Sequence, residues 1–329
     1  MSSVAVLGAG SWGTTLAIHL ANLGHEVRIW GNDRGELVAL DRDRENRKFL
    51  SGIPLPSGIK VQPELDRALE GSDFHFFVVP SQATREVAAA VRERVAGGVA
   101  VCASKGLELG TLQRLSVVLS ETLGDGAPVA FTGPSHAEEV ATGIPTSIVA
   151  ACADEARAKA VQVLCSSQRL RVYTNDDVTG CEYGGALKNV IAIAAGICDG
   201  LGYGDNTKGA LLTRGLAEIS RLGVALGGKR ETFFGLTGMG DLIATAMSRH
   251  SRNRHVGERL GKGETLEQVL GAMVMVAEGV TTARAARDLG RRHGVEMPIT
   301  EQVCAILLEG REPREAMLAL MTRDLKREN

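Results

Sequence analysis

The sequence predicts an α/β chain in which a doubly wound sheet fills residues 1–177 and an all-helical domain fills residues 178–329. In the first part, short runs of β-branched residues alternate with helical segments, as in sheets of parallel strands covered by helices. In the second part, long helical segments are joined by glycine-rich turns. A length of 329 residues and a hydrophobic content of 44% suit two domains with buried cores.

Seven strands are expected in the first domain, each a short apolar run bounded by turn residues. The predicted strands cover residues 4–8, 26–30, 74–79, 99–103, 129–132, 147–151 and 170–173. A helix is predicted over residues 14–23, with Gly24 at its end. The second domain should contain helices at 183–199, 208–226, 241–247, 281–293, 299–308 and 314–321. Pro298 and Pro313 stand where the last two begin, a position that proline favours.

Composition narrows the class of protein. A formal net charge of −2 gives no reason to expect a nucleic-acid partner, and the basic segment 249–255 lacks interleaved aromatic side chains that stack on bases. No apolar run approaches the roughly 20 residues of a membrane helix, and the first residues form no basic leader. Six cysteines without paired spacing argue against zinc and for reduced thiols. We therefore expect a cytoplasmic protein without a metal or a membrane insertion.

A glycine-rich loop follows the first predicted strand, with Gly8, Gly10 and Gly13 in the stretch VAVLGAGSWGTTLA. In this context Gly8 makes the turn, Gly10 lets the backbone approach a pyrophosphate, and Gly13 allows close packing. The N–H groups of a helix from Thr14 would face the anion. The loop therefore predicts a dinucleotide on a Rossmann-type sheet, and a tight turn without a ligand is the alternative. Trp12 should turn away from the pyrophosphate and pack at the cofactor edge, between the domains.

The end of the second predicted strand bears on which dinucleotide binds. An acidic residue there binds the ribose 2′-hydroxyl of NAD, whereas a nearby arginine accommodates the 2′-phosphate of NADP. The segment Trp30-Gly31-Asn32-Asp33-Arg34 offers both chemistries. We therefore expect NADH, NADPH or both as the cofactor, without a metal.

Lys188 is the strongest candidate for acid–base chemistry. It lies in CEYGGALKNVIAIAAG, where small and apolar residues share its side of the helix. Burial there would lower its pKa and let it donate a proton near neutral pH. Gly184 and Gly185 indicate that something approaches this backbone closely. The alternative is a lysine whose chain reaches along the helix to solvent.

Other polar residues end strands or begin helices. Lys105 follows the fourth predicted strand, where it could reach a bound anion or lie on the surface. Asp241 begins a helix with Thr245 one turn on, and it could equally cap that helix. In Ser251-Arg252-Asn253 a hydroxyl, a guanidinium and an amide precede a helix and can converge on a phosphate. Glu278, before a further helix, indicates by itself only a cap.

Together these motifs resemble one family, the bacterial NAD(P)-dependent glycerol-3-phosphate dehydrogenases. The matching pieces span nearly the whole chain: GAGSWGTTLA, VPSQATR, SKGLE, GPSHAEEVA, CEYGGALKNVIAIAAGICDGLGYGDNTKGALLTRGLAEI, GLTGMGDLIATAMSRHSRN and AEGVTT. The resemblance implies reversible hydride transfer between NAD(P)H and dihydroxyacetone phosphate, giving sn-glycerol 3-phosphate for glycerophospholipid synthesis. It also suggests a homodimer.

The resemblance assigns roles to the matching positions. Lys188 would be the general acid that protonates the carbonyl oxygen as hydride arrives. The substrate would be bound by Lys105, Gly133, Ser135, Lys188, Asn189, Asp241, Thr245, Ser251, Arg252 and Asn253. The cofactor would be bound by Gly8, Gly10, Ser11, Trp12, Gly13, Arg34, Lys105, Ala137, Arg252, Val276 and Glu278.

Two places depart from the family pattern. Asn32 and Asp33 precede Arg34 where the family often has a basic residue, which weakens the expectation of an NADPH preference. His136 stands where the family commonly has phenylalanine, and we expect the packing there to differ without a change of chemistry. Two other functions stay open at this point: a hydroxyacid dehydrogenase of the same plan, and a non-catalytic protein that senses a dinucleotide.

Overall fold

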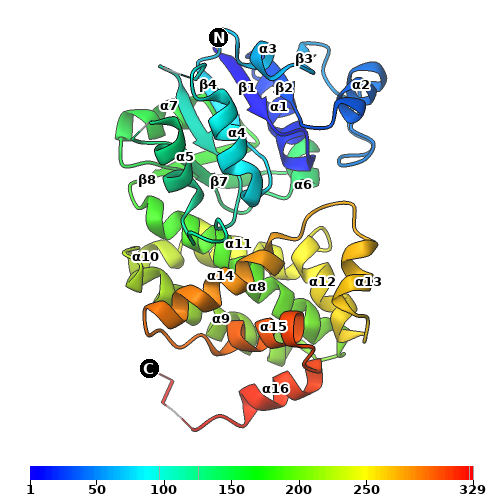
Figure 1. The fold of residues 1–329 in the computed structure, drawn as a ribbon, viewed down its shortest axis with the longest axis vertical. Coiled ribbons are helices and arrows are strands. Elements are labelled where there is room, and N and C mark those ends of the chain that lie inside the picture. The colour runs from blue at the N-terminus through cyan, green and yellow to red at the C-terminus, as the bar shows by residue number, and fades with distance from the viewer. Residues whose placement is uncertain (96, 125, 326, 329) are drawn as a thin grey trace.

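The computed structural model describes residues 1–95, 97–124, 126–325 and 327–328. A sheet flanked by helices lies above a group of helices, and the chain passes from the upper part to the lower part once (Figure 1). No helix among the described residues is long and apolar enough to cross a membrane. We call the two parts the sheet domain and the helical domain.

The sheet has eight strands in the order β3-β2-β1-β4-β5-β6-β7-β8. They are β1 (Ser3–Leu7), β2 (Glu26–Trp30), β3 (Ile59–Val61), β4 (Phe74–Phe77), β5 (Val99–Cys102), β6 (Val129–Thr132), β7 (Thr146–Ala151) and β8 (Leu170–Asn175). The seven-strand prediction missed β3, whose three residues form no apolar run. The parallel arrangement also fails at one junction, because β7 runs antiparallel to β6 while every other neighbouring pair is parallel.

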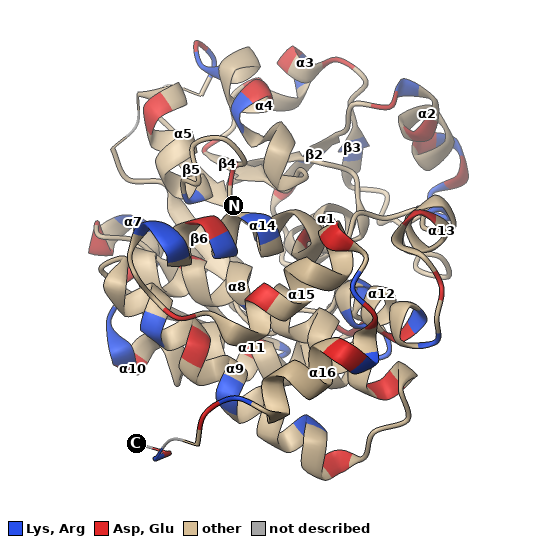
Figure 2. Cartoon of the chain, turned by 60° about the horizontal axis from the view of Figure 1, so that its bottom comes forward, with Lys and Arg blue, Asp and Glu red and all other residues tan. Residues whose placement is uncertain are grey.

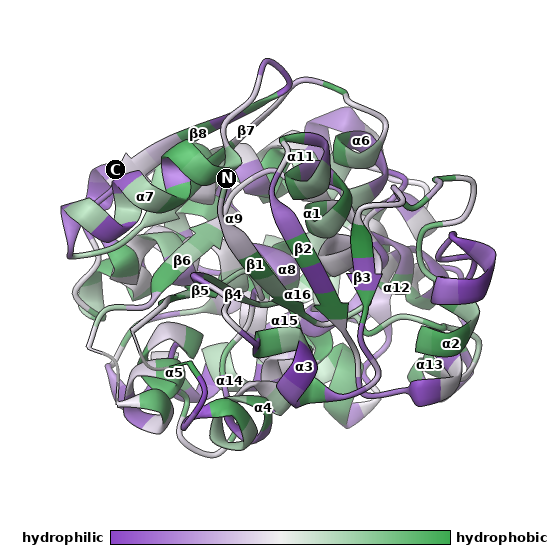
Figure 3. Ribbon diagram, turned by 90° about the horizontal axis from the view of Figure 1, so that it is seen from above, coloured by the Kyte–Doolittle hydropathy of each residue, from purple (hydrophilic) through white to green (hydrophobic). Residues whose placement is uncertain are grey.

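Helices cover both faces of this sheet, and their hydrophilic residues lie toward the rim, as on α2 and α3 (Figure 3). The helices of the sheet domain are α1 (Ser11–Asn22), α2 (Arg34–Asp43), α3 (Leu65–Leu69), α4 (Thr84–Val91), α5 (Leu115–Leu123), α6 (Ala137–Ala141) and α7 (Glu155–Cys165). The first helix begins three residues earlier than predicted, because Gly10 already occupies the N-cap position. Its first N–H groups are therefore those of residues 11–13, inside the glycine loop.

The helical domain is arranged around α8 (Val178–Gly200), which is buried over almost its whole length and carries few charged residues (Figure 2). The surrounding helices are α9 (Asp205–Ala225), α10 (Arg230–Phe233), α11 (Asp241–Met247), α12 (Arg252–Gly261), α13 (Leu266–Gly271), α14 (Glu278–Arg292), α15 (Pro298–Glu309) and α16 (Pro313–Met321). The predicted helix starts at Pro298 and Pro313 are confirmed.

Glycines let α8 and α12 approach until their backbones touch. A Cβ added to Gly257 of α12 would lie 1.9 Å from the carbonyl oxygen of Ile193, and one on Gly196 of α8 would lie 2.0 Å from that of Arg254. Real Cβ atoms cannot approach backbone so closely, so both positions require glycine. This contact fixes the first two turns of α12 beside the C-terminal half of α8.

Polar contacts join the two domains. The Glu182 carboxylate of α8 accepts hydrogen bonds from the Ser116 N–H (2.9 Å) and from the Arg114 guanidinium (2.6 Å) at the start of α5. The Glu278 carboxylate of α14 accepts one from the Ser81 N–H (3.0 Å), just beyond β4. Each contact satisfies backbone or guanidinium donors of one domain with a carboxylate of the other.

We expect Gly257→Ala to lower the free energy of unfolding by about 2 kcal/mol, because the added methyl group forces α12 away from α8. Chemical denaturation measures the change. The matched control is Gly209→Ala in α9, where an added Cβ would meet nothing within 4 Å. Since alanine favours a helix over glycine, the control should be stabilised by up to about 1 kcal/mol. Equal effects of the two substitutions would contradict the close packing.

Candidate active site

A cleft of about 680 Å³ lies between the two domains, at the carboxyl ends of the parallel strands. Ligands collect at this edge of open α/β sheets. Nearly every predicted site residue lines it: Gly8, Gly10, Ser11, Trp12, Gly13, Lys105, Ser135, Ala137, Lys188, Asn189, Asp241, Thr245, Ser251, Arg252, Asn253, Val276 and Glu278.

The glycine loop has the geometry that its sequence predicts. Gly8 has φ +128°, and a Cβ there would lie 2.4 Å from the Val78 carbonyl oxygen. A Cβ on Gly13 would lie 1.8 Å from the carbonyl oxygen of Gly8, so this glycine allows the helix to pack against the turn. A Cβ on Gly10, by contrast, would meet nothing within 4 Å. The backbone at Gly10 is therefore open to a ligand from the cleft.

Trp12 lines the cleft and packs against the hydrophobic core of the sheet domain. Its indole Nε1 is buried and has no hydrogen-bond partner among the described residues. The ring thus forms part of the apolar wall beside the glycine loop. The sequence also predicts packing of Trp12 between the domains, but the core that it contacts belongs to the sheet domain alone.

Three charged side chains from both domains meet at the inner end of the cleft. The Lys188 ammonium donates to Asp241 Oδ1 (2.7 Å) and to Thr245 Oγ1 (2.5 Å). The Lys105 ammonium donates to Asp241 Oδ2 (2.8 Å), to the Gly133 carbonyl oxygen (2.7 Å) and to Ser135 Oγ (3.2 Å). One carboxylate therefore lies between two ammonium groups. We call Lys105, Asp241 and Lys188 the charge triad.

Burial and the neighbouring charges shift the pKa values of Lys188 and Asp241 in the charge triad. Lys188 is 5% exposed and Asp241 is 1% exposed. Desolvation lowers the pKa of Lys188 to about 8, Asp241 works against this shift, and the charge of Lys105 adds to it. Burial alone would raise the pKa of the Asp241 carboxyl, but the two ammonium groups outweigh it and lower that pKa. Lys188 can therefore gain and lose a proton near neutral pH while Asp241 stays ionised.

The structural alternatives that the sequence left open for these three residues, a helix cap and two solvent-exposed lysines, are wrong. Asp241 does not cap α11, because Gly240 occupies the N-cap and the carboxylate turns to the two lysines. Lys188 does not reach solvent along its helix, and Lys105 does not lie on the surface.

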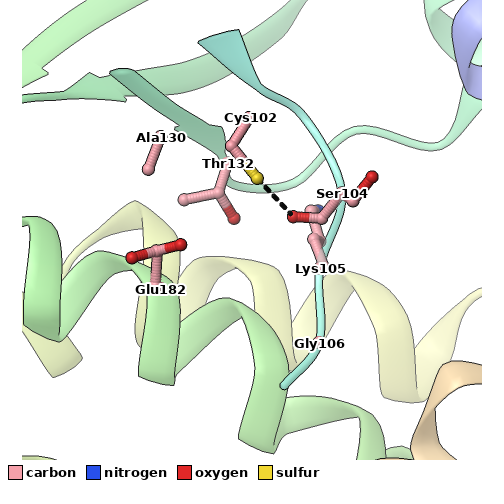
Figure 4. A pocket seen from close by; sticks show the side chains of 7 residues that line it. All are labelled: Cys102, Ser104, Lys105, Gly106, Ala130, Thr132 and Glu182. Atoms are coloured by element: carbon pink, nitrogen blue, oxygen red, sulfur yellow. Dashed lines mark hydrogen bonds between the residues drawn. The ribbon is translucent and has the colours of Figure 1, made fainter. Parts of the chain in front are cut away.

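The close approach expected at Gly184 and Gly185 is real, but protein atoms make it. A Cβ on Gly184 would lie 2.6 Å from the Thr237 carbonyl oxygen, and one on Gly185 would lie 2.5 Å from Thr132 Oγ1. A small pocket of about 10 Å³ lies here (Figure 4). It is lined by β6, by the end of β5 with the segment 104–106 that follows it, and by Glu182 of α8. The two glycines thus let α8 pack against the sheet and against residues 236–240, the helical turn that leads directly into α11 and Asp241.

The motif Ser251-Arg252-Asn253 is tied into the helical domain. Ser251 Oγ caps α12 by accepting from the Arg254 N–H (3.2 Å). The Asn253 amide donates to Asn189 Oδ1 (2.9 Å), and its oxygen accepts from the Gly279 N–H (2.9 Å). The side chain of Asn253 therefore connects α8, α12 and α14. Its amide nitrogen and oxygen each have a protein partner.

Arg252 and Glu278 lie at the same side of the cleft. The Arg252 guanidinium donates to the Val276 carbonyl oxygen (2.7 Å), and the Glu278 carboxylate is bound by Ser81 across the domain boundary. Val274 and Val276 are apolar yet about half exposed or more, and both line the cleft.

Two predicted site residues do not line the cleft. Gly133 instead accepts a hydrogen bond from the Lys105 ammonium through its carbonyl oxygen. The Arg34 side chain is 77% exposed, and its guanidinium lies 3.6 Å from the Glu64 carboxylate. Arg34 is the first residue of α2, so it points outward, whereas Asp33 at the N-cap lines the cleft.

The sequence interpretation missed part of the cleft wall. Phe49, Leu65 and Val87 come from three separate segments that carry no motif, so the sequence held no signal that marked them. His136 and His250 also line the cleft, with ring centroids 6.3 Å apart. Burial lowers the pKa of His136, while its hydrogen bond with the Ala244 carbonyl oxygen works against the shift.

The sheet with its glycine loop, the inter-domain cleft and the buried lysine define a two-domain, dinucleotide-dependent dehydrogenase. Among the described residues, no group of three metal-ligating side chains comes together. Comparison with known proteins narrows this class.

Residues 3–158 match the family model for the N-terminus of NAD-dependent glycerol-3-phosphate dehydrogenase, and residues 177–318 match the model for its C-terminus. A protein of Pelodictyon phaeoclathratiforme named glycerol-3-phosphate dehydrogenase, NAD(P)+, is 48% identical over 330 residues, covering 99% of each chain. One of Salinibacter ruber with the same description is 49% identical, covering 100% of this chain and 98% of the other. The crystal structure of glycerol-3-phosphate dehydrogenase from Coxiella burnetii has a TM-score of 0.95 and 38% identity, covering 98% and 99% of the two chains. The chain belongs to the glycerol-3-phosphate dehydrogenase family.

We expect Asp241→Asn to lower the free energy of unfolding by about 3 kcal/mol at pH 7, because it leaves buried ammonium groups without a counter-charge. The folded protein favours the neutral form of Lys188, since the pKa of this side chain is about 8 in the fold and 10.5 ordinarily. The Asp241→Asn variant loses the charge that raises the Lys188 pKa, so its folded state releases the Lys188 proton at lower pH than wild type does. The difference in stability should therefore narrow as pH rises toward 8 and level off above it, where Lys188 is neutral in both folded proteins. Urea denaturation at several pH values measures this.

Asp176→Asn is the control for that measurement. Asp176 pairs with Lys229 on the surface, so its loss should cost little at any pH. A stability difference for Asp241→Asn that does not change with pH would contradict the coupling to Lys188.

Proposed function

We propose that the chain catalyses reversible hydride transfer between NAD(P)H and dihydroxyacetone phosphate, with sn-glycerol 3-phosphate as the reduced product. The observation that carries this proposal is the charge triad at the end of a cleft that begins at the glycine loop. Its Lys188 is a buried acid with a pKa of about 8, in a chain of the glycerol-3-phosphate dehydrogenase family.

A nicotinamide dinucleotide fits the residues present. The backbone is open at Gly10, the first N–H groups of α1 lie in the loop, and the cleft volume is in the range of ligand sites. Gly8, Gly10, Ser11, Trp12 and Gly13 would hold the cofactor at one end. Ala137, Lys105, Arg252, Val276 and Glu278 would lie along it. When bound, the reduced cofactor supplies the hydride.

Lys188 is the proposed general acid. An ammonium group has three hydrogens, and among the described residues two of them are bound, by Asp241 and by Thr245. The third can bind the carbonyl oxygen of the substrate, stabilise the alkoxide as it forms, and then transfer its proton to it. In the reverse direction neutral Lys188 accepts the proton of the hydroxyl group.

Lys105 supports this chemistry through Asp241. Its three hydrogens are taken by Asp241, Gly133 and Ser135. It therefore holds the carboxylate in place and adds a positive charge that favours loss of the Lys188 proton. We propose that Lys105 is a positioning residue, which contacts substrate only if it gives up one of these bonds.

The phosphate group of the substrate would lie at the start of α12. Arg252 supplies a guanidinium and the helix supplies the positive end of its dipole. Asn253 and Asn189 would position this end of the site, because their amide groups bind each other and the Gly279 backbone. Phosphate binding there gives remote binding energy that holds the carbonyl beside Lys188.

Wider features of the function are proposals of the same kind. We propose a role in glycerophospholipid synthesis in the cytoplasm and a homodimeric assembly, in keeping with the family. We also propose that the two domains meet between residues 177 and 178. Asp177 supports this division, since its side chain caps α8 by accepting from the Gly180 N–H (2.8 Å).

A steady-state assay tests the reaction itself. We expect oxidation of NADH or NADPH with dihydroxyacetone phosphate, and negligible oxidation with small keto acids that carry a carboxylate in place of the phosphate. Turnover of the keto acids alone would indicate a hydroxyacid dehydrogenase. Cofactor binding without turnover of any of these substrates would indicate a dinucleotide-sensing protein.

Lys188→Ala should lower kcat by about a hundred-fold or more, because the alkoxide loses both its counter-charge and its proton donor. Wild-type reduction should slow as pH rises through about 8, where Lys188 loses its proton, and the reverse oxidation should speed up over the same range. Rates from pH 6.5 to 10 measure both directions. Lys188→Arg should abolish this pH dependence, and cofactor titration should show unchanged affinity in both variants. Near-wild-type turnover in either variant would remove Lys188 from the mechanism.

A further inference from the structure

The corner of the cleft at the end of β2 lies directly against the glycine loop. The Gly8 N–H donates to the carbonyl oxygen of Trp30, the last residue of β2, at 2.7 Å. Beyond this strand end the cleft is lined by Gly31, Asn32, Asp33 and Glu36. In sheets of this type the adenosine ribose of a dinucleotide lies here. The group at the ribose 2′ position would therefore meet these residues.

Carboxylates dominate this corner. Asp33 caps α2, with Oδ1 accepting from the Glu36 N–H at 3.0 Å. Its second oxygen, Oδ2, accepts no hydrogen bond from any described residue. That oxygen is an open acceptor of the kind that binds a hydroxyl group.

The cationic side chains near this corner, Arg34 and Lys48, already have carboxylate partners. Arg34 does not line the cleft, and its guanidinium lies beside the Glu64 carboxylate. Lys48 forms an ion pair with Glu36, so these two charges cancel. Asp33 forms no ion pair within the described part of the chain, and the corner keeps its negative charge.

We propose that Asp33, with Glu36 keeping the Lys48 ammonium engaged, makes this chain select NADH over NADPH; the proposal rests on the proposed function of the same cleft. A ribose 2′-hydroxyl can donate to Asp33 Oδ2. A 2′-phosphate would instead bring an anion against this carboxylate, and no cation of the corner is free to receive it. Discrimination by repulsion of the wrong ligand is an effective source of specificity.

Direct titration of the intact protein with NADH and with NADPH tests the selection. The two tryptophans of the chain, Trp12 and Trp30, both line the cleft, so their fluorescence should report binding without substrate or turnover. We expect a Kd for NADPH about ten-fold or more above that for NADH. Equal or tighter binding of NADPH would overturn this inference and leave the proposed function intact. Binding of neither nucleotide would overturn both.

Charge-neutral variants locate the effect. In Asp33→Asn with Glu36→Gln, asparagine still caps α2, but the repulsion is gone and Lys48 is released from its partner. The ratio of the two Kd values should fall about ten-fold. The matched control is Asp41→Asn, which removes a carboxylate of the same helix that pairs with Arg44 and does not line the cleft. An unchanged ratio in the double variant, or an equal change in the control, would overturn the inference.

Discussion

The carboxylate of Asp241, held between two ammonium groups, is the interaction on which the rest of the structure depends. Asp241 and Lys188 belong to the helical domain, while Lys105 comes from the end of a strand in the sheet domain. A buried carboxylate that loses a partner is costly, so this site is complete only when the two domains pack together. The contact that joins the domains therefore also sets how tightly Lys188 holds its proton.

Helix α8 keeps this geometry through backbone contacts. Gly184 and Gly185 let it pack against the helical turn 236–240 and the sheet, and Gly196 brings it against α12. Because these contacts involve backbone atoms that cannot move aside, they fix the rotation of the helix about its axis and hence the direction of Lys188. The next residue, Asn189, carries the same constraint to α12 and α14 through Asn253. The acid and the proposed phosphate end of the cleft are thus held by one rigid helix.

Much of this fold could be predicted from the sequence, and the failures have physical causes. Hydrophobic patterns located seven strands and the central helices, since each pattern reflects burial of a continuous segment, and glycine spacing located the loop after the first strand. Strand β3 has three residues and no such pattern, so it forms through its pairing with β2. The reversed direction of β7 could not be predicted, because alternation of side chains is the same in parallel and antiparallel strands.

The candidate site shows the same limit at the level of single side chains. Spacing in the sequence identifies residues that reach a strand end or helix start, but partners distant in the chain decide where each side chain points. Arg34 turns to Glu64 and leaves Asp33 in the cleft, and Glu278 is bound by Ser81, 197 residues away in sequence. Two lysines of equal promise in the sequence also differ in a way that no motif contains. Lys105 has protein partners for all three hydrogens, whereas Lys188 has partners for two, so of these two lysines only Lys188 can bind a carbonyl oxygen without giving up a hydrogen bond that it already makes.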